Sequence, residues 1–195
     1  MQLRTTRCFL LMAIATVLMA YDMPHGWLKG GSAPLQYEMG TDVGAGQHGK
    51  NAATIRSIRQ DVNGYGNMVQ SIASDRYKGK RLRFTGYLKT KNVDQWAGLL
   101  MKVITKKKEP TTGHEYGTII AYDNMYNRFV NGTQDFTKYE IVLDVPDSAT
   151  DIVFGARLTG AGQIWFDKLK FDVVDNNVPV TSSGLEEPTN LDFEK

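Results

Sequence analysis

Residues 160–174, GAGQIWFDKLKFDVV, have the pattern of a turn followed by a β-strand. Successive side chains of a strand point to opposite faces. One expected face is apolar except for a carboxylate and carries Trp165, Asp167, Leu169, Phe171 and Val173. The other carries Ile164, Phe166, Lys168, Lys170 and Asp172. A carboxylate directed at a core is costly unless it is paired, hydrogen-bonded or bound to a metal. We therefore expect Asp167 to have a structural role in the closing strand.

The chain between about residues 51 and 174 repeats this kind of pattern. KRLRFTGYLK (80–89) alternates, with Leu82, Phe84, Gly86 and Leu88 expected to face inward. The expected strands are 52–59, 66–73, 80–89, 98–104, 117–122, 138–145, 152–158 and 163–174. No convincing amphipathic helix interrupts them. The sequence predicts an all-β fold, a two-sheet antiparallel β-sandwich of the jelly-roll kind with about eight to ten strands.

The N-terminus has the layout of a secretory signal peptide. Arg4 and Arg7 precede an apolar run that ends at Ala20. We expect residues 1–20 to be removed, residues 21–174 to form the sandwich domain and residues 175–195 to be a polar tail. The protein is then secreted or periplasmic, with no membrane span after signal removal. The alternative is an N-terminal core helix or an uncleaved anchor.

Composition restricts the chemistry of the mature chain. Cys8 is the only cysteine and lies in the expected signal peptide, which excludes disulfides and thiolate chemistry. The full chain has 23 basic and 21 acidic residues, and the loss of Arg4 and Arg7 makes the numbers equal. No excess charge favours nucleic acid or anionic lipid as a partner.

Motifs for catalysis are weak. GAGQHGKN (44–51) matches part of a phosphate-binding loop, but Asn51 replaces the magnesium-binding Ser or Thr and the next segment is an expected strand. A glycine-rich turn is the better interpretation, and we expect no nucleotide cofactor. The three histidines are far apart, and no spacing brings two carboxylates such as Glu38 and Asp94 together. We therefore expect a protein that is not an enzyme.

Aromatic and amide side chains on expected loops and outward faces suggest a ligand site instead. Sugar recognition uses flat apolar surfaces for C–H faces and polar groups for hydroxyls. The candidate ligand-binding residues are Trp96, Tyr87, Tyr122, Asn124, Tyr126 and Arg128. The alternatives are that DNMYN (123–127) is only a turn-forming cluster and that Trp96 packs at the edge of the core.

Three stretches in this order resemble the galactose-binding-like jelly-roll domains, which are similar to carbohydrate-binding modules and to sensor or accessory modules of bacterial regulators. They are GYLKTKNVDQWAGLLMKV, AYDNMYNRFVNGTQDFTKYEIVLDVP and IVFGARLTGAGQIWFDKLKFDVV. The resemblance covers about residues 26–174. It departs from the family at Leu100 and Phe136, where relatives often carry tryptophan.

The resemblance also implies a structural calcium ion. In related modules an acid of the last strand and an acid of an N-x-x-F-E strand hold the ion, and the matching residues here are Asp167 and Glu194. The second acid belongs to NLDFEK at the chain end, so residues 190–194 are expected to dock as a strand.

Together these observations predict a non-catalytic binding module whose partner is a carbohydrate or glycan surface. A structural or protein-interaction module without a small-molecule ligand is the first alternative. A glycan-processing enzyme is the second.

Overall fold

The computed structural model describes residues 21–181 and contains nine β-strands joined by turns and three short 3₁₀ helices. The strands are β1 (Trp27–Gly31), β2 (Tyr37–Asp42), β3 (Ala52–Ser57), β4 (Tyr65–Ala73), β5 (Lys80–Lys108), β6 (Glu115–Asp123), β7 (Val130–Val145), β8 (Asp151–Thr159) and β9 (Gln163–Val174). The 3₁₀ helices are η1 (Pro34–Gln36), η2 (Gln47–Gly49) and η3 (Tyr126–Arg128). Within this part of the chain, no helix is long and apolar enough to span a membrane.

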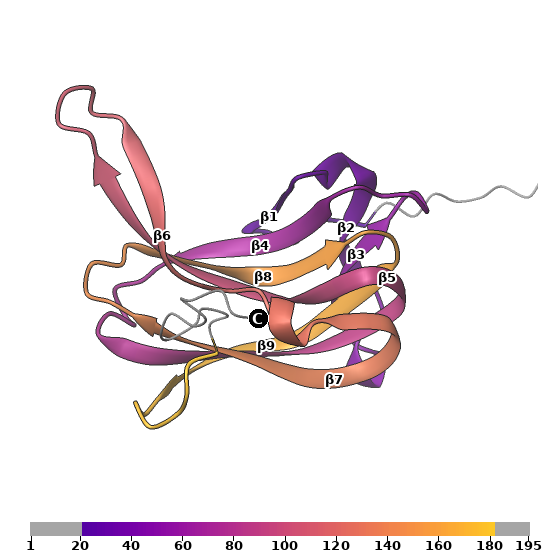
Figure 1. Ribbon diagram of the computed structural model, residues 1–195. Helices are drawn as coiled ribbons and strands as arrows, with labels where there is room; N and C mark the ends of the chain where they lie inside the picture. Colours follow the sequence, from indigo (N-terminus) through magenta and orange to yellow (C-terminus); the bar gives the residue numbers. More distant parts are fainter. Residues whose placement is uncertain (1–20, 182–195) are drawn as a thin grey trace, which may run out of the picture.

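Two antiparallel layers pack face to face (Figure 1). The first sheet has the order β2-β3-β9-β5-β7, and the second has the order β1-β4-β8-β5-β6. β5 belongs to both sheets because residues 81–91 pair with β9 and residues 96–104 pair with β8. The predicted all-β jelly-roll sandwich is confirmed.

The prediction of separate strands at 80–89 and 98–104 is wrong, because both segments belong to β5. Residues 92–95 carry the chain from one sheet to the other within the same strand. Asn92 takes a left-handed φ of 51° at this bend. The prediction also missed β1 and β2, whose residues lie before Asn51.

The core lies between the two layers and is closed by aromatic contacts. Phe84 of the first sheet stacks on Phe171, with ring centroids 5.0 Å apart, and meets Phe154 of the second sheet at 5.5 Å. Trp27 on β1 contacts both Phe154 and Phe166 at 5.8 Å. Leu82, Phe84 and Leu88 are fully buried, as the alternation of residues 80–89 predicted.

β9 departs from simple alternation at a β-bulge. Tyr87 of β5 pairs with Asp167, whereas Thr85 pairs with Lys170, so β9 has one residue more than β5 between these two pairs. Lys168 takes a left-handed φ of 51° in the bulge. The bulge shifts the phase of the strand, so Ile164 and Phe166 before it and Leu169 and Phe171 after it contact the core. The prediction that Asp167 points at the core is therefore wrong.

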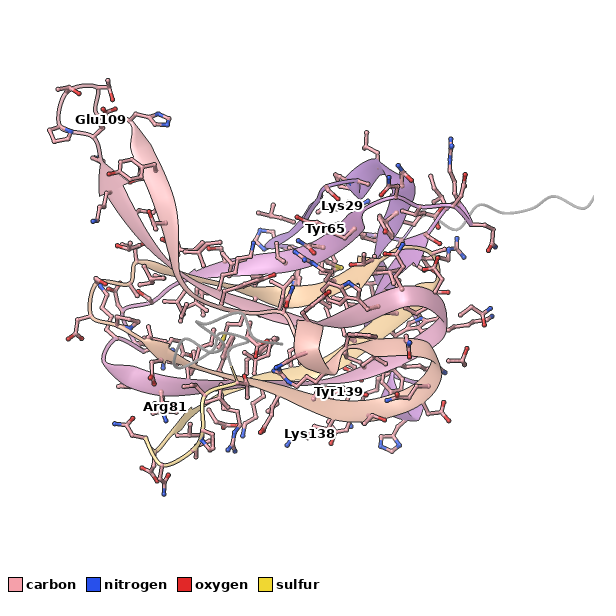
Figure 2. The ribbon with its side chains drawn as sticks, in the orientation of Figure 1. Lys29, Tyr65, Arg81, Glu109, Lys138 and Tyr139 are labelled. Carbon is pink, nitrogen blue, oxygen red and sulfur yellow. The ribbon has the colours of Figure 1, made fainter. Side chains whose placement is uncertain are left out.

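The end of β5 and β6 form a hairpin that projects from the sandwich, with Glu109 at its tip (Figures 1 and 2). Residues 106–118 are exposed. At the other end of the described chain, residues 175–181 lie against β7. The Arg81 guanidinium donates to the Val178 carbonyl (2.6 Å), and the backbone N–H of Thr181 donates to the Val142 carbonyl (2.9 Å).

Candidate functional site

Four of the predicted ligand-binding residues gather at the second sheet. Trp96 lies on β5, Tyr122 lies on β6, and Asn124 and Tyr126 belong to the β6–β7 loop. Trp96 and Tyr126 meet edge to face, with ring centroids 5.8 Å apart. Asn124 is buried, and its side-chain oxygen accepts the backbone N–H of Tyr126 at 3.1 Å.

An arginine that the sequence did not single out lies at the centre of this group. Arg157 on β8 is 9% exposed, and its guanidinium carbon is 3.8 Å from the ring centroid of Tyr65 and 5.5 Å from that of Trp96. Its Nε donates a 2.9 Å hydrogen bond to the side-chain oxygen of Asn67 on β4. Tyr65 is labelled on β4 in Figure 2.

Strand register explains why these side chains share the outer face of the second sheet. Asn67, Arg157 and Gly98 lie side by side on β4, β8 and β5. Tyr65 and Trp96 lie two residues further along their strands, both opposite Thr159, and therefore point to the same face. Neighbours in register on adjacent strands point to the same face. We call this group the aromatic–cation cluster; it consists of Tyr65, Asn67, Trp96, Lys102, Tyr122, Tyr126 and Arg157.

Charge in the cluster is positive and partly desolvated. Lys102 on β5 has its ammonium nitrogen 5.5 Å from the ring centroid of Tyr122. Burial, and secondly the charge of Arg157, lower the pKa of Lys102 below its usual value. Burial raises the pKa of the Tyr122 hydroxyl, and the charge of Arg157 opposes this rise. The cluster therefore offers aromatic faces, amides and two cations to a ligand.

Two buried side chains, Met125 and Asp123, fix the loop that carries Asn124 and Tyr126. Met125 takes a left-handed φ of 62° and is fully buried, and its sulfur accepts the backbone N–H of Leu99 at 3.3 Å. Asp123 is fully buried, accepts the backbone N–H of Met125 at 2.7 Å and pairs with Arg128 at 2.6 Å. Arg128 thus stabilises the loop through its ion pair with Asp123, and it lies outside the aromatic–cation cluster.

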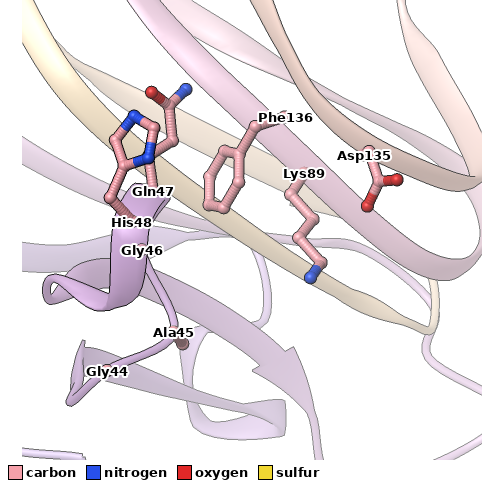
Figure 3. Close-up of a pocket in the computed structure, with 8 residues that line it drawn as sticks. All are labelled: Gly44, Ala45, Gly46, Gln47, His48, Lys89, Asp135 and Phe136. Carbon is pink, nitrogen blue, oxygen red and sulfur yellow. The ribbon is translucent and has the colours of Figure 1, made fainter.

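Tyr87 lies on the other sheet and is also outside the cluster. Its ring centroid is 5.7 Å from the ammonium nitrogen of Lys168. Nearby, the outer face of the first sheet has a shallow hollow of about 600 Å³ between the glycine-rich loop and the β5–β7 pair (Figure 3). It is lined by Gly44, Ala45, Gly46, Gln47, His48, Lys89, Asp135 and Phe136.

The glycine-rich segment 44–51 connects β2 to β3 and contains only η2. The predicted glycine-rich turn is confirmed, because a strand follows the segment. Phe136, which stands where the resembled family often has tryptophan, faces the hollow, and the Lys89 ammonium lies 5.8 Å from its ring centroid. The hollow therefore offers one phenyl ring and one imidazole beside mostly polar groups.

Asp167 is anchored to this glycine-rich loop. One carboxylate oxygen accepts the backbone N–H of Gln47 at 3.2 Å, and the other accepts the backbone N–H of Lys168 at 2.6 Å. Glu194, the second predicted calcium ligand, and the predicted strand at 190–194 lie outside the described residues. Among residues 21–181, no three His, Cys, Asp or Glu side chains are grouped to hold a metal ion. The calcium ion stays a prediction.

Sequence reasoning missed Tyr65, Lys102, Asn67 and Arg157. For Asn67 and Arg157, which hold the centre of the cluster, the only local signal is that each is a polar residue inside a mostly apolar strand, in NMVQ and in FGARL. Alternation places both on an outward face. Only the pairing of β4 with β8 shows that their side chains meet, and their positions are 90 residues apart in the chain.

Comparison with known proteins found one close match in sequence and many matches in fold. The chain is 39% identical over 176 residues to YbfP of Bacillus subtilis (strain 168), named an uncharacterised HTH-type transcriptional regulator. The match covers 87% of this chain and 57% of YbfP, so the chain spans somewhat more than half the length of that relative. No family model matches the chain.

Solved structures of carbohydrate-binding modules share the architecture. The tandem CBM22-1–CBM22-2 domain of Xyn10C from Paenibacillus barcinonensis matches 77% of this chain and 46% of that domain pair, with a TM-score of 0.50 and 12% identity. The C-terminal family 22 module of Clostridium thermocellum Xyn10B covers 76% of this chain and 86% of its own, with a TM-score of 0.48 and 12% identity. Residues 21–181 thus form a jelly-roll β-sandwich, the fold that they share with the Xyn10C tandem domain.

Proposed function

We propose that this chain is a non-catalytic module that binds carbohydrate at the aromatic–cation cluster. The observation that supports the proposal is the convergence of Trp96, Tyr122 and Tyr126 around Arg157 on one face of the second sheet. These four residues come from four different elements, β5, β6, η3 and β8, and their spacing along the chain does not require them to meet.

The chemistry of the cluster suits a sugar. Aromatic faces pack against the C–H faces of pyranose rings, and fixed amide and guanidinium groups bind hydroxyls. Tyr126 is 62% exposed at the rim of the cluster, whereas Arg157 is held still by Asn67 and Tyr65. A site whose polar groups are fixed before binding loses less entropy when the ligand arrives.

A glycan array with the full chain, followed by calorimetry on each hit, tests the proposal. We expect Trp96→Ala and Tyr122→Ala each to weaken binding at least about tenfold, because removing an aromatic anchor usually costs more than other contacts. Tyr116→Ala is the matched control, since Tyr116 is exposed on the projecting hairpin and should leave affinity unchanged. Circular dichroism melting of each variant verifies folding. Unchanged affinity in both cluster variants would place the site elsewhere.

The alternatives give different results in the same experiments. A blank array with folded protein favours a structural or protein-interaction module. Conversion of a bound glycan to shorter products favours a glycan-processing enzyme, whereas the proposed module returns its ligand unchanged. The absence of enzymatic activity therefore stays a prediction, and analysis of the glycan after binding tests it directly.

The relative YbfP supports a more specific form of the proposal. Because the sequence match is to a protein named as a transcriptional regulator, we propose that the module serves as the ligand-sensing part of a regulatory protein. Residues 1–20 predict export, which would place such a sensing module outside the cytoplasm. Cell fractionation of the full chain measures the compartment.

A further inference from the structure

The two cations of the aromatic–cation cluster have no acidic partner among the described residues. Seven ion pairs occur in residues 21–181, and neither Arg157 nor Lys102 takes part in one. Arg157 is the only basic residue of this part of the chain that is buried. Burial of a charge is costly unless an opposite charge or hydrogen bonds compensate it. The cluster therefore carries positive charge that no carboxylate among the described residues neutralises.

Neighbouring side chains fix the guanidinium of Arg157 and leave its two terminal nitrogens free to donate hydrogen bonds. Its Nε is occupied by Asn67, and one face of the group is covered by Tyr65 at 3.8 Å. The two terminal nitrogens have no hydrogen-bond partner among the described residues, and neither is fully enclosed. A planar guanidinium with two free N–H groups matches the two oxygens of a carboxylate.

Lys102 adds a second cation on the same face. It lies four residues beyond Gly98, the β5 neighbour of Arg157, so alternation points both side chains outward. Burial first, and repulsion by the like charge of Arg157 second, lower the pKa of Lys102. An anion bound at this face would relieve the repulsion and replace part of the lost hydration of both groups.

We propose that the aromatic–cation cluster selects acidic carbohydrate, with a uronic-acid carboxylate bound by Arg157 and Lys102 and the sugar ring against Trp96 and Tyr126. The inference rests on the proposed carbohydrate-binding function and names the ligand class of the same site. Neutral glycans lack the group that the two cations require.

The probes are oligosaccharides of galacturonic and glucuronic acid and the methyl esters of the same oligosaccharides, titrated into the full chain at constant ionic strength. The ester keeps the sugar and removes the charge. We expect at least one acid to bind about tenfold or more tightly than its ester, since a charge-assisted hydrogen bond contributes more than a neutral one. The preference should shrink as salt is raised.

Two variants locate the carboxylate. Lys102→Met keeps the aliphatic stem and should weaken acid binding about tenfold while leaving ester binding unchanged. Arg157→Gln should abolish the preference for the acid. Lys107→Met, on the exposed part of the projecting hairpin, is the matched control and should change neither affinity. If Arg157→Gln does not fold, Lys102→Met alone decides.

Each contrary outcome has its own meaning. Equal affinity for acids and esters, or an array that shows only neutral glycans, overturns the acidic ligand and leaves the proposed function standing. Tighter binding of sulfated oligosaccharides than of uronic acids overturns the carboxylate assignment. A blank array with folded protein contradicts the proposed function itself.

Discussion

Tyr37 shows how a single side chain holds distant turns together. Its ring is buried, and its hydroxyl oxygen lies within hydrogen-bond distance of the carbonyl oxygens of Gly64 (3.0 Å) and Gly160 (2.9 Å), to which the hydroxyl donates. Gly64 precedes β4 and Gly160 follows β8, so the hydroxyl lies at one end of that strand pair. Burial, followed by the charge of Asp94, raises the pKa of Tyr37 from 10.0 to about 12.

This shift predicts a loss of stability at alkaline pH. The raised pKa of Tyr37 favours its neutral form in the folded state, so its contribution is complete below pH 10 and falls as pH rises toward 12. The loss should amount to roughly 2–3 kcal/mol, because one pKa unit corresponds to about 1.4 kcal/mol. Urea unfolding of the wild type and Tyr37→Phe at several pH values from 9 to 12 measures it. Tyr37→Phe should be less stable at pH 9 and lose less above pH 10, whereas parallel curves would contradict the assignment.

Turns and bulges decide how the strands of this sandwich fit together. The turn between β8 and β9 packs against β5 where β5 bends from one sheet to the other. Gly162 has a φ of 123°, and an added Cβ would lie 2.7 Å from the carbonyl oxygen of Asn92 and 2.7 Å from the Cα of Val93. The close approach of two backbones at this point requires glycine.

We expect Gly162→Ala to lower the free energy of unfolding by more than about 1 kcal/mol, because the new methyl group meets backbone and the φ is unfavourable for alanine. Gly30→Ala on β1 is the matched control. No atom lies within 4 Å of a Cβ there, so this variant should be neutral or slightly stabilising. Thermal melting of both variants measures the difference. Equal melting temperatures would mean that the turn can move away from β5.

Besides β5, a buried hydrogen-bond cluster also connects the two sheets, between the end of β6 and β7. Asp123 at the end of β6 is fully buried and accepts hydrogen bonds from Arg128, from the backbone of Met125 and from the Thr181 hydroxyl (2.6 Å). The Thr181 hydroxyl oxygen also accepts the backbone N–H of Val142 on β7 at 2.8 Å. This cluster connects the loop of the proposed ligand site to residues 175–181.

Arg128→Met should lower the free energy of unfolding by about 3 kcal/mol, because it leaves the buried carboxylate of Asp123 without its ion partner. The double variant Asp123→Asn/Arg128→Met should recover part of this loss, since no buried charge remains. Lys170→Met, in the exposed pair with Asp172, is the control and should change stability by less than about 1 kcal/mol. Chemical denaturation measures all three. A double variant that is no more stable than Arg128→Met would show that the charge of Asp123 does not cause the loss.

Local pattern predicted the elements whose burial repeats every second residue. β9 runs from Gln163 to Val174 as expected, and the inward residues Leu82, Phe84 and Leu88 are fully buried. These assignments succeeded because a strand with one face on a core needs apolar side chains at alternate positions. The expected phase of β9 was right at Leu169 and Phe171 and wrong before the bulge, where Ile164 and Phe166 contact the core. It failed there because a lysine at a positive φ leaves no sign in the sequence.

By itself, then, the sequence determined the fold class, most of the strands and three of the four aromatic residues of the proposed site, Trp96, Tyr122 and Tyr126. Only the tertiary structure decided that Arg157 meets Asn67 and Tyr65, that Arg128 supports a loop through Asp123, and that Tyr87 lies on the other sheet. The physical reason is the distance along the chain over which each feature is determined. Alternation depends on neighbours in the chain, whereas the site depends on strand register between segments 90 residues apart, which packing of the whole sandwich sets.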